Sequence, residues 1–179
     1  EFDEIADYYI ERFGKMPLPP YIRREPEEGD RISYQTVYAK TEGAIAAPTA
    51  GLHFTESLLD EIHKKGAEIQ YITLHIGAGT FKPVKTDDIR KHNIHSEYRE
   101  IPEQTALSVS RAKREGRRVI AVGTTVVRAI ESSVDEKGNL RPAAGPTELF
   151  IYPGFRFQIV DGLITNFHLP CSTLLMLVS

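Results

Sequence analysis

Apolar side chains recur every three or four residues over positions 2–13, at Phe2, Ile5, Ala6, Tyr9, Ile10 and Phe13. This spacing places them on one face of a helix. Gly14 follows directly, and glycine readily ends a helix. The pattern predicts an amphipathic helix over 2–13.

A connector comes next. Residues 16–22 contain three prolines, which fix φ and remove backbone donors, so this segment is predicted to be extended. The charged run over 23–30 continues it as a loop, and 33–39 fits either a strand or a helix. We therefore divide the chain into a helix and proline-rich connector, 1–22, and an α/β domain, 23–179.

The rest of the chain alternates between helical and strand patterns. Helical periodicity recurs over 55–65, 102–115, 125–134 and the residues after Pro170. Apolar or alternating runs predict strands at the start of 43–54 and over 67–76, 117–122, 148–152 and 157–167. Helix-then-strand units of this size predict an α/β fold with a parallel core, either open or closed as a barrel.

Composition excludes several classes of protein. With 41% hydrophobic and 26% charged residues, the chain is neither disordered, collagen-like nor a coiled coil. Its longest apolar run, 174–178, is too short to span a bilayer. The single cysteine, Cys171, excludes an internal disulfide framework and fits a reducing compartment. No signal-peptide pattern opens the chain, so we expect a cytoplasmic protein that does not bind a membrane.

Both chain ends indicate a longer protein. The chain starts with Glu1 instead of Met, and it stops within an apolar run at Ser179. A helix that begins after Pro170 would end there with unpaired apolar residues. We therefore expect a fragment of a longer chain.

Candidate chemistry lies in four loops that follow predicted strands, here called the strand-end loops: 49–54, 75–81, 123–128 and 165–169. Each loop contains or adjoins a glycine or a proline, and it carries a hydroxyl group and a histidine or arginine. Parallel α/β folds bind ligands at the carboxyl ends of their strands. We therefore expect the four loops to surround one polar pocket.

Two motifs invite other interpretations. Residues 77–79 are Gly-Ala-Gly, but a dinucleotide loop needs G-x-G-x-x-G at the start of a helix, and Pro83 argues against one. His92, His95 and Glu97 are zinc-type ligands, but their spacing is not H-E-x-x-H. We expect no metal, and a histidine or glutamate that acts as acid or base is the better interpretation.

Structural roles remain open for some of the same residues. His75 and His168 could be satisfied histidines at strand ends, although their loop contexts favour a site role. Arg128 lies one turn into a helix that begins at 123–125. It could bind an anion beside that helix start, or it could be a solvated helix residue.

A basic run is the candidate nucleic-acid patch. The net charge of -3 gives no overall attraction to nucleic acid, so such a partner would need a local basic face. The densest one lies around a predicted helix end and consists of Arg111, Lys113, Arg114, Arg117 and Arg118. Runs of this kind are also common on solvated faces.

Eight segments together resemble a known family. They are MPLPPYI (16–22), YQTVYA (34–39), AAPTAGLHF (46–54), LHIGAGTF (74–81), HSEY (95–98), VIAVGTTVVR (119–128), LFIYPGF (149–155) and LITNFHLPCSTLLMLVS (163–179). In this order they resemble the S-adenosylmethionine:tRNA ribosyltransferase-isomerases of queuosine biosynthesis. The resemblance implies an α/β, parallel barrel-like core domain. It also implies a two-domain protein whose small β-barrel domain is largely absent from this chain.

The resemblance also implies an activity. Such an enzyme transfers and isomerises the ribosyl group of S-adenosylmethionine onto 7-aminomethyl-7-deazaguanine at the tRNA wobble position. Epoxyqueuosine, adenine and methionine are the products. The partners implied are tRNA and S-adenosylmethionine, and we expect a monomer.

The reaction needs a base for the acidic C–H beside the sulfonium, a donor for the departing adenine and a base for the acceptor amine. Candidate acid/base groups in the matched segments are His53, His75, His95, Glu97 and His168. Candidate substrate-binding residues are Thr49, Phe81, Thr124, Thr125, Arg128 and Asn166. Two alternatives stay open: a non-catalytic tRNA-binding fragment and a metal-dependent hydrolase.

Overall fold

The structure is a computed structural model, and it describes residues 8–10, 12–19, 22–41, 43–44, 46–77, 89 and 94–179. In the segment predicted as the first helix, residues 8–10 and 12–13 are helical, and the others lie outside the described residues. No described helix is long and apolar enough to cross a membrane.

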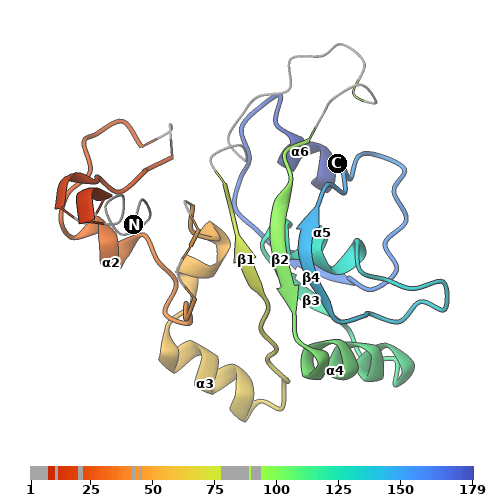
Figure 1. The fold of residues 1–179 in the computed structure, drawn as a ribbon. Coiled ribbons are helices and arrows are strands. Elements are labelled where there is room, and N and C mark those ends of the chain that lie inside the picture. Colours follow the sequence, from red (N-terminus) through yellow and green to blue (C-terminus); the bar gives the residue numbers. More distant parts are fainter. Residues whose placement is uncertain are drawn as a thin grey trace.

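The described strands form two sheets (Figure 1). One has the order β1-β2-β4 and joins Thr73–His75, Glu97–Ile101 and Ala143–Thr147 in antiparallel pairs. The other pairs β3 (Ile120–Val122) with β5 (Gly162–Ile164) in parallel. The chain therefore has a mixed α/β fold. A parallel core is correct for β3 and β5 and wrong for the other three strands.

Side-chain caps mark the start of helices α3 and α6. Thr55 accepts a hydrogen bond from the Leu58 N–H at 3.1 Å and starts α3, Glu56–Lys64. Ser172 accepts one from the Leu175 N–H at 3.2 Å and starts α6, Thr173–Val178. Each cap satisfies a backbone donor that the first helical turn leaves unpaired. Besides the helical residues 8–10 and 12–13, the described part of the chain also contains α2 (Asp30–Ser33), α4 (Glu103–Arg114) and α5 (Thr124–Glu131).

Several strand predictions need correction. The described part of 43–54 contains no strand, and a 3-10 helix, η1, occupies Thr49–His53. Residues 148–152 are irregular, and β5 takes up only the middle of 157–167. The backbone of this segment packs closely against its neighbours, because a Cβ at Gly51 would lie 2.8 Å from the Thr36 methyl group.

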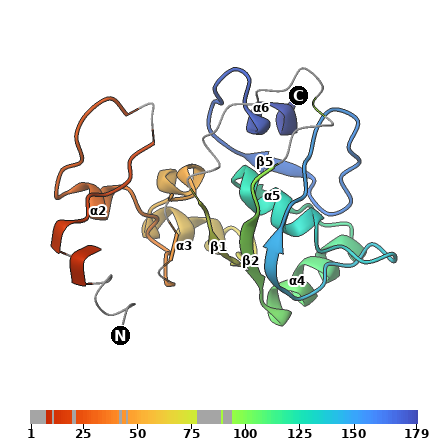
Figure 2. The same ribbon diagram turned by 45° about the horizontal axis from the view of Figure 1, so that its top comes forward.

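The helices surround the antiparallel sheet on different sides. In both views, α3 lies on the β1 side, and α2 lies farther out on that side (Figures 1 and 2). β2 leads directly into α4, and α6 lies toward the opposite end of β2 (Figure 1). Because β1 and β2 are antiparallel, the amino-terminal end of β2 and the carboxyl-terminal end of β1 lie at the same end of the sheet.

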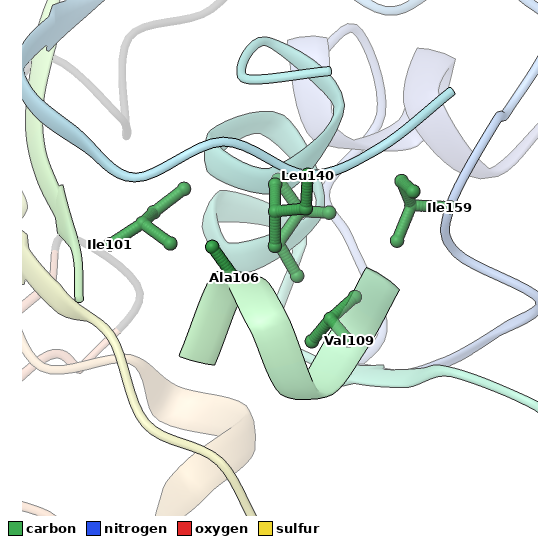
Figure 3. Close-up of a cluster of buried hydrophobic side chains, with 6 residues drawn as sticks. Ile101, Ala106, Val109, Leu140 and Ile159 are labelled. Carbon is green, nitrogen blue, oxygen red and sulfur yellow. The ribbon is translucent and has the colours of Figure 1, made fainter. Parts of the chain in front are cut away.

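Two apolar clusters form the described core. The first joins β2, α4 and α5 and contains Ile101, Ala106, Val109, Ile130, Leu140 and Ile159 (Figure 3). The second contains Ala121, Val127, Ile151 and Leu177, so it anchors α6 against α5 and β3. Helix α5 contributes to both clusters, and a displacement of α5 would therefore disturb both.

A buried carboxylate holds the segment before β5. Glu131 accepts hydrogen bonds from the backbone N–H groups of Gln158, Ile159 and Val160 at 2.9, 3.0 and 2.9 Å. Glu131 is only 5% exposed. These bonds satisfy three backbone donors that no sheet partner reaches, and they tie the approach to β5 to the end of α5.

Candidate functional site

Two of the strand-end loops meet at Asn166. Its Oδ1 lies 3.0 Å from Nε2 of His53, and its Nδ2 donates to Oγ1 of Thr49 at 2.8 Å. Thr49 and His53 come from η1, and Asn166 comes from the loop after β5. We call these three residues the Asn166 cluster. It joins a predicted acid/base residue to two predicted substrate-binding residues.

A third strand-end loop lies beside this cluster. The Gly123 N–H donates to the Ile164 carbonyl at 2.9 Å, at the carboxyl ends of parallel strands β3 and β5. Gly123 has φ +99°, which only glycine adopts without strain, and it turns the chain into α5. Thr124 and Thr125 follow and are 6% and 7% exposed. Their burial favours a role in holding this turn, and their substrate-binding role stays a prediction.

Arg128 and Glu97 form a buried ion pair. Nη1 of Arg128 donates to Oε2 of Glu97 at 2.8 Å, and the side chains are 5% and 3% exposed. Arg128 also donates to the Leu149 carbonyl at 2.9 Å and to the His95 carbonyl at 3.4 Å. Burial lowers the pKa of Arg128, and the Glu97 carboxylate opposes that effect. Of the two alternatives for Arg128, the solvated helix residue is wrong, and the anion-binding role stays a prediction. The guanidinium already has three partners within the protein.

His75 is packed against its neighbours. Its ring and the ring of Tyr98 are 5.2 Å apart in an edge-on arrangement, opposite each other in the β1–β2 register. A Cβ at Gly43, which has φ +124°, would lie only 2.5 Å from Nδ1 of His75. These contacts support the structural interpretation of His75. His95, just before β2, is exposed and carries the carbonyl that Arg128 holds.

His168 is half-buried two residues beyond Asn166. Its Nε2 lies 3.2 Å from the Thr165 hydroxyl oxygen. Burial lowers the pKa of His168, so the imidazole is neutral at pH 7 and can accept a proton.

Hydrogen bonds made by residues in or next to the described parts of the strand-end loops link these loops in pairs. The Ala46 N–H donates to the Ile76 carbonyl at 3.1 Å and links the approach to η1 with the end of β1. Phe81 lies outside the described residues, and the single pocket stays a prediction. A cavity of about 530 Å³ follows β3, and its lining includes Phe54 at the end of one loop and Val122 and Ile164 just before two others. Most of its other lining side chains are apolar.

Within the described ranges, no three His, Cys, Asp or Glu side chains gather closely enough to hold a metal ion. His92 lies outside these ranges, so the trio with His95 and Glu97 cannot be placed. The expectation of a metal-free protein stays a prediction.

Comparison with known proteins identifies the family. The model of the family described as "Queuosine biosynthesis protein" matches residues 1–179. The chain belongs to this family.

Curated relatives carry the name S-adenosylmethionine:tRNA ribosyltransferase-isomerase. The Syntrophotalea carbinolica protein is 61% identical over 170 residues, which are 95% of this chain and 50% of that protein. The Carboxydothermus hydrogenoformans protein is 58% identical over 178 residues, which are 99% of this chain and 52% of that protein. The chain spans about half the length of the curated relatives it matches.

A solved structure supports the mixed α/β fold of this queuosine biosynthesis family member. It is a crystal structure of an S-adenosylmethionine tRNA ribosyltransferase from Thermotoga maritima, with a TM-score of 0.56 and 40% sequence identity. The match covers 72% of this chain and 40% of that chain.

The basic run of this family member is largely paired. Glu68 lies 3.3 Å from Arg111 and 3.4 Å from Arg117. Lys113 donates to Asp161 at 2.7 Å, and this bond lowers the pKa of Asp161. The pairs leave less free positive charge than the sequence indicates, and they favour the solvated-face interpretation.

Sequence reasoning missed one exposed aromatic residue. Phe167 lies between Asn166 and His168, and it is 106% exposed. Its neighbour Leu169 is 59% exposed. The sequence pattern places Phe167 at the end of the predicted strand over 157–167, where no exposed ring is expected. Its position between two candidate site residues was the available signal for a binding role.

Proposed function

We propose that this chain carries the catalytic α/β part, 23–179, of a tRNA ribosyltransferase-isomerase. The enzyme would transfer and isomerise the ribosyl group of S-adenosylmethionine onto 7-aminomethyl-7-deazaguanine at the tRNA wobble position. It would release adenine and methionine and form epoxyqueuosine. Membership of the queuosine family and the names of the relatives support this proposal.

The Asn166 cluster is the observation that carries the proposal at the level of residues. It brings an exposed imidazole, a carboxamide and a hydroxyl together from two loops, with hydrogen bonds of 3.0 and 2.8 Å. The cluster lies beside the carboxyl ends of β3 and β5, where α/β proteins bind their ligands. The cavity along β3 supports a small-molecule site next to it.

The proposed chemistry needs proton transfers and no redox step. The sulfonium acidifies the adjacent ribose C–H, so a neutral imidazole can take that proton. A second proton must leave the acceptor amine before or as its nitrogen bonds to the ribosyl carbon. His53 is exposed and His168 is half-buried, and the two histidines lie on adjoining loops. We assign the acid/base roles to them because His53 belongs to the Asn166 cluster and His168 lies two residues beyond Asn166. S-adenosylmethionine supplies the ribosyl group as a substrate.

Phe167 is the proposed stacking surface for a base of the tRNA. Single-stranded RNA bases stack on aromatic side chains, and each such contact contributes about 1–3 kcal/mol. The fully exposed ring lies next to Asn166 in sequence. A wobble base held there would be close to the acid/base groups.

Adenine release tests the proposed function. A full-length chain that carries these 179 residues would be incubated with S-adenosylmethionine and tRNA containing the aminomethyl-deazaguanine base. We expect adenine and methionine in equal amounts, no release with guanine at the wobble position and no effect of a chelator. Binding of tRNA without adenine release would favour the tRNA-binding alternative. Release that is lost with a chelator and restored by zinc would overturn the metal-free mechanism.

A further inference from the structure

We infer that Asn166 is a positioning residue that fixes the orientation and tautomer of His53. The catalytic part of this inference rests on the proposed function, whereas the tautomer is a property of the chain itself. The sequence suggested that Asn166 binds substrate. The structure instead directs both ends of its carboxamide to protein groups.

The carboxamide has one accepting end and one donating end. Its Nδ2 group donates to Thr49 Oγ1 at 2.8 Å, which turns Oδ1 toward His53. Oδ1 only accepts, and it lies 3.0 Å from Nε2 of His53. The neutral imidazole must therefore carry its hydrogen on Nε2 to make this bond.

The tautomer determines which nitrogen can react. With hydrogen on Nε2, the lone pair of the neutral ring is on Nδ1. Among the described residues, Nδ1 of His53 has no hydrogen-bond partner, and the residue is exposed. Nδ1 is thus the atom that accepts a proton from a substrate. The protonated ring would keep its bond to Asn166, because Nε2 donates in both states.

The two loops also restrict the ring physically. His53 ends the short helix η1, whose backbone contains the closely packed Gly51. Asn166 lies 113 residues later, just after β5. A bond across this separation joins two loops that local sequence does not hold together, and it limits the rotation of an otherwise exposed side chain. Thr49 is the anchor, because it sets which end of the carboxamide faces the ring.

Nitrogen-15 NMR of the histidine side chains reads the tautomer directly. The spectra of the full chain would be assigned with His53→Gln and with the exposed His63→Gln as control. We expect the Nε2–H form for His53 in the wild-type chain and loss of ring order in Asn166→Ala. Asn166→Asp keeps the acceptor and adds a charge, so it should keep the hydrogen on Nε2 and favour the protonated ring. Thr49→Val should weaken the effect of Asn166, and Thr49→Ser should restore it.

Kinetics of the full-length enzyme separate positioning from folding. Asn166→Ala should lower kcat at least tenfold with little change in the KM for S-adenosylmethionine. Asn166→Asp should recover much of kcat, with the acidic limb of the pH–rate profile moved to higher pH, because the added carboxylate favours the protonated ring and the base must be unprotonated to react. A general loss of structure would not produce recovery with a shifted pH profile.

The outcomes distinguish this inference from the proposed function. Observation of Nδ1–H in the wild-type chain would mean that the carboxamide faces the other way, and it would overturn the inference. An unchanged His53 signal and kcat in Asn166→Ala would also overturn it. Wild-type enzyme that shows the Nε2–H form but releases no adenine would contradict the proposed function alone.

Discussion

The guanidinium of Arg128 donates to the carboxylate of Glu97 at 2.8 Å inside the protein. Arg128 belongs to α5, and Glu97 is the first residue of β2. The pair therefore connects the helix that packs on both apolar clusters to the amino-terminal end of the central strand of the antiparallel sheet. The bond from Arg128 to the His95 carbonyl extends this connection to the residues that precede β2.

Removal of either partner should destabilise the fold. A single buried charge left without its counter-ion costs about 3–5 kcal/mol. We expect Glu97→Ala and Arg128→Ala each to lower the free energy of unfolding by about that amount. The double variant should lose much less than the sum, as measured by urea unfolding in a double-mutant cycle. Additive losses would show that the two side chains do not depend on each other.

His168 should make stability depend on pH. Burial lowers its folded-state pKa, so the unfolded chain binds the proton more readily as the pH falls below about 6.5. The associated stability is present above that pH and is lost as the pH falls through the folded-state value. Urea unfolding at pH about 7.5 and about 5 should show a smaller loss for His168→Gln than for wild type. His63→Gln is the control on an exposed histidine, and an equal loss in wild type and His168→Gln would exclude this role.

Phe167 should contribute to tRNA affinity without contributing to stability. Its ring is fully exposed, so Phe167→Ala removes no packing. Loss of one base-stacking contact should weaken tRNA binding by about 1–3 kcal/mol, while Phe167→Tyr should bind like wild type. Leu107→Ala on α4, which truncates a 56% exposed side chain, is the matched control. Unchanged tRNA affinity in Phe167→Ala would remove Phe167 from the binding surface.

The basic run should matter little for tRNA. Arg117 already pairs with Glu68 and Glu115 at 3.4 and 2.8 Å, and exposed pairs contribute about 0–1 kcal/mol. We expect Arg114→Glu with Arg117→Glu to reduce tRNA affinity by less than about fivefold and to leave S-adenosylmethionine affinity unchanged. A large loss of tRNA affinity with a flatter salt dependence would identify the run as a phosphate-binding patch.

Local signals predicted the helices well and the sheets poorly. The caps Thr55 and Ser172 and the glycine after α3 act within one helical turn, so the sequence is sufficient to locate them. Strand β4 contains Gly145 and Pro146 and looks like a loop. It becomes a strand because it pairs with β2, which lies about 45 residues earlier. That pairing has no signature in its own sequence.

The candidate site was likewise predictable where it depends on local sequence and not where it depends on distant pairing. His53 and Asn166 could be predicted as site residues, because hydroxyl and imidazole groups near glycine or proline can be recognised within a short segment of sequence. Their mutual hydrogen bond joins η1 to the loop after β5, 113 residues later, so no local pattern in the sequence shows it. The pairing of Arg128 with Glu97 was not predicted, because burial of both groups is set by the surrounding clusters and not by their neighbours in sequence.

The kcat of a His53→Gln variant, measured by adenine release in the full-length enzyme, tests most directly whether the Asn166 cluster is the catalytic site. A lost acid/base group lowers the rate by about 10²–10⁴. We expect a decrease in that range for His53→Gln with an unchanged melting temperature and S-adenosylmethionine affinity, and wild-type kcat for His63→Gln on α3. Wild-type kcat in His53→Gln would show that the reaction takes place without this cluster.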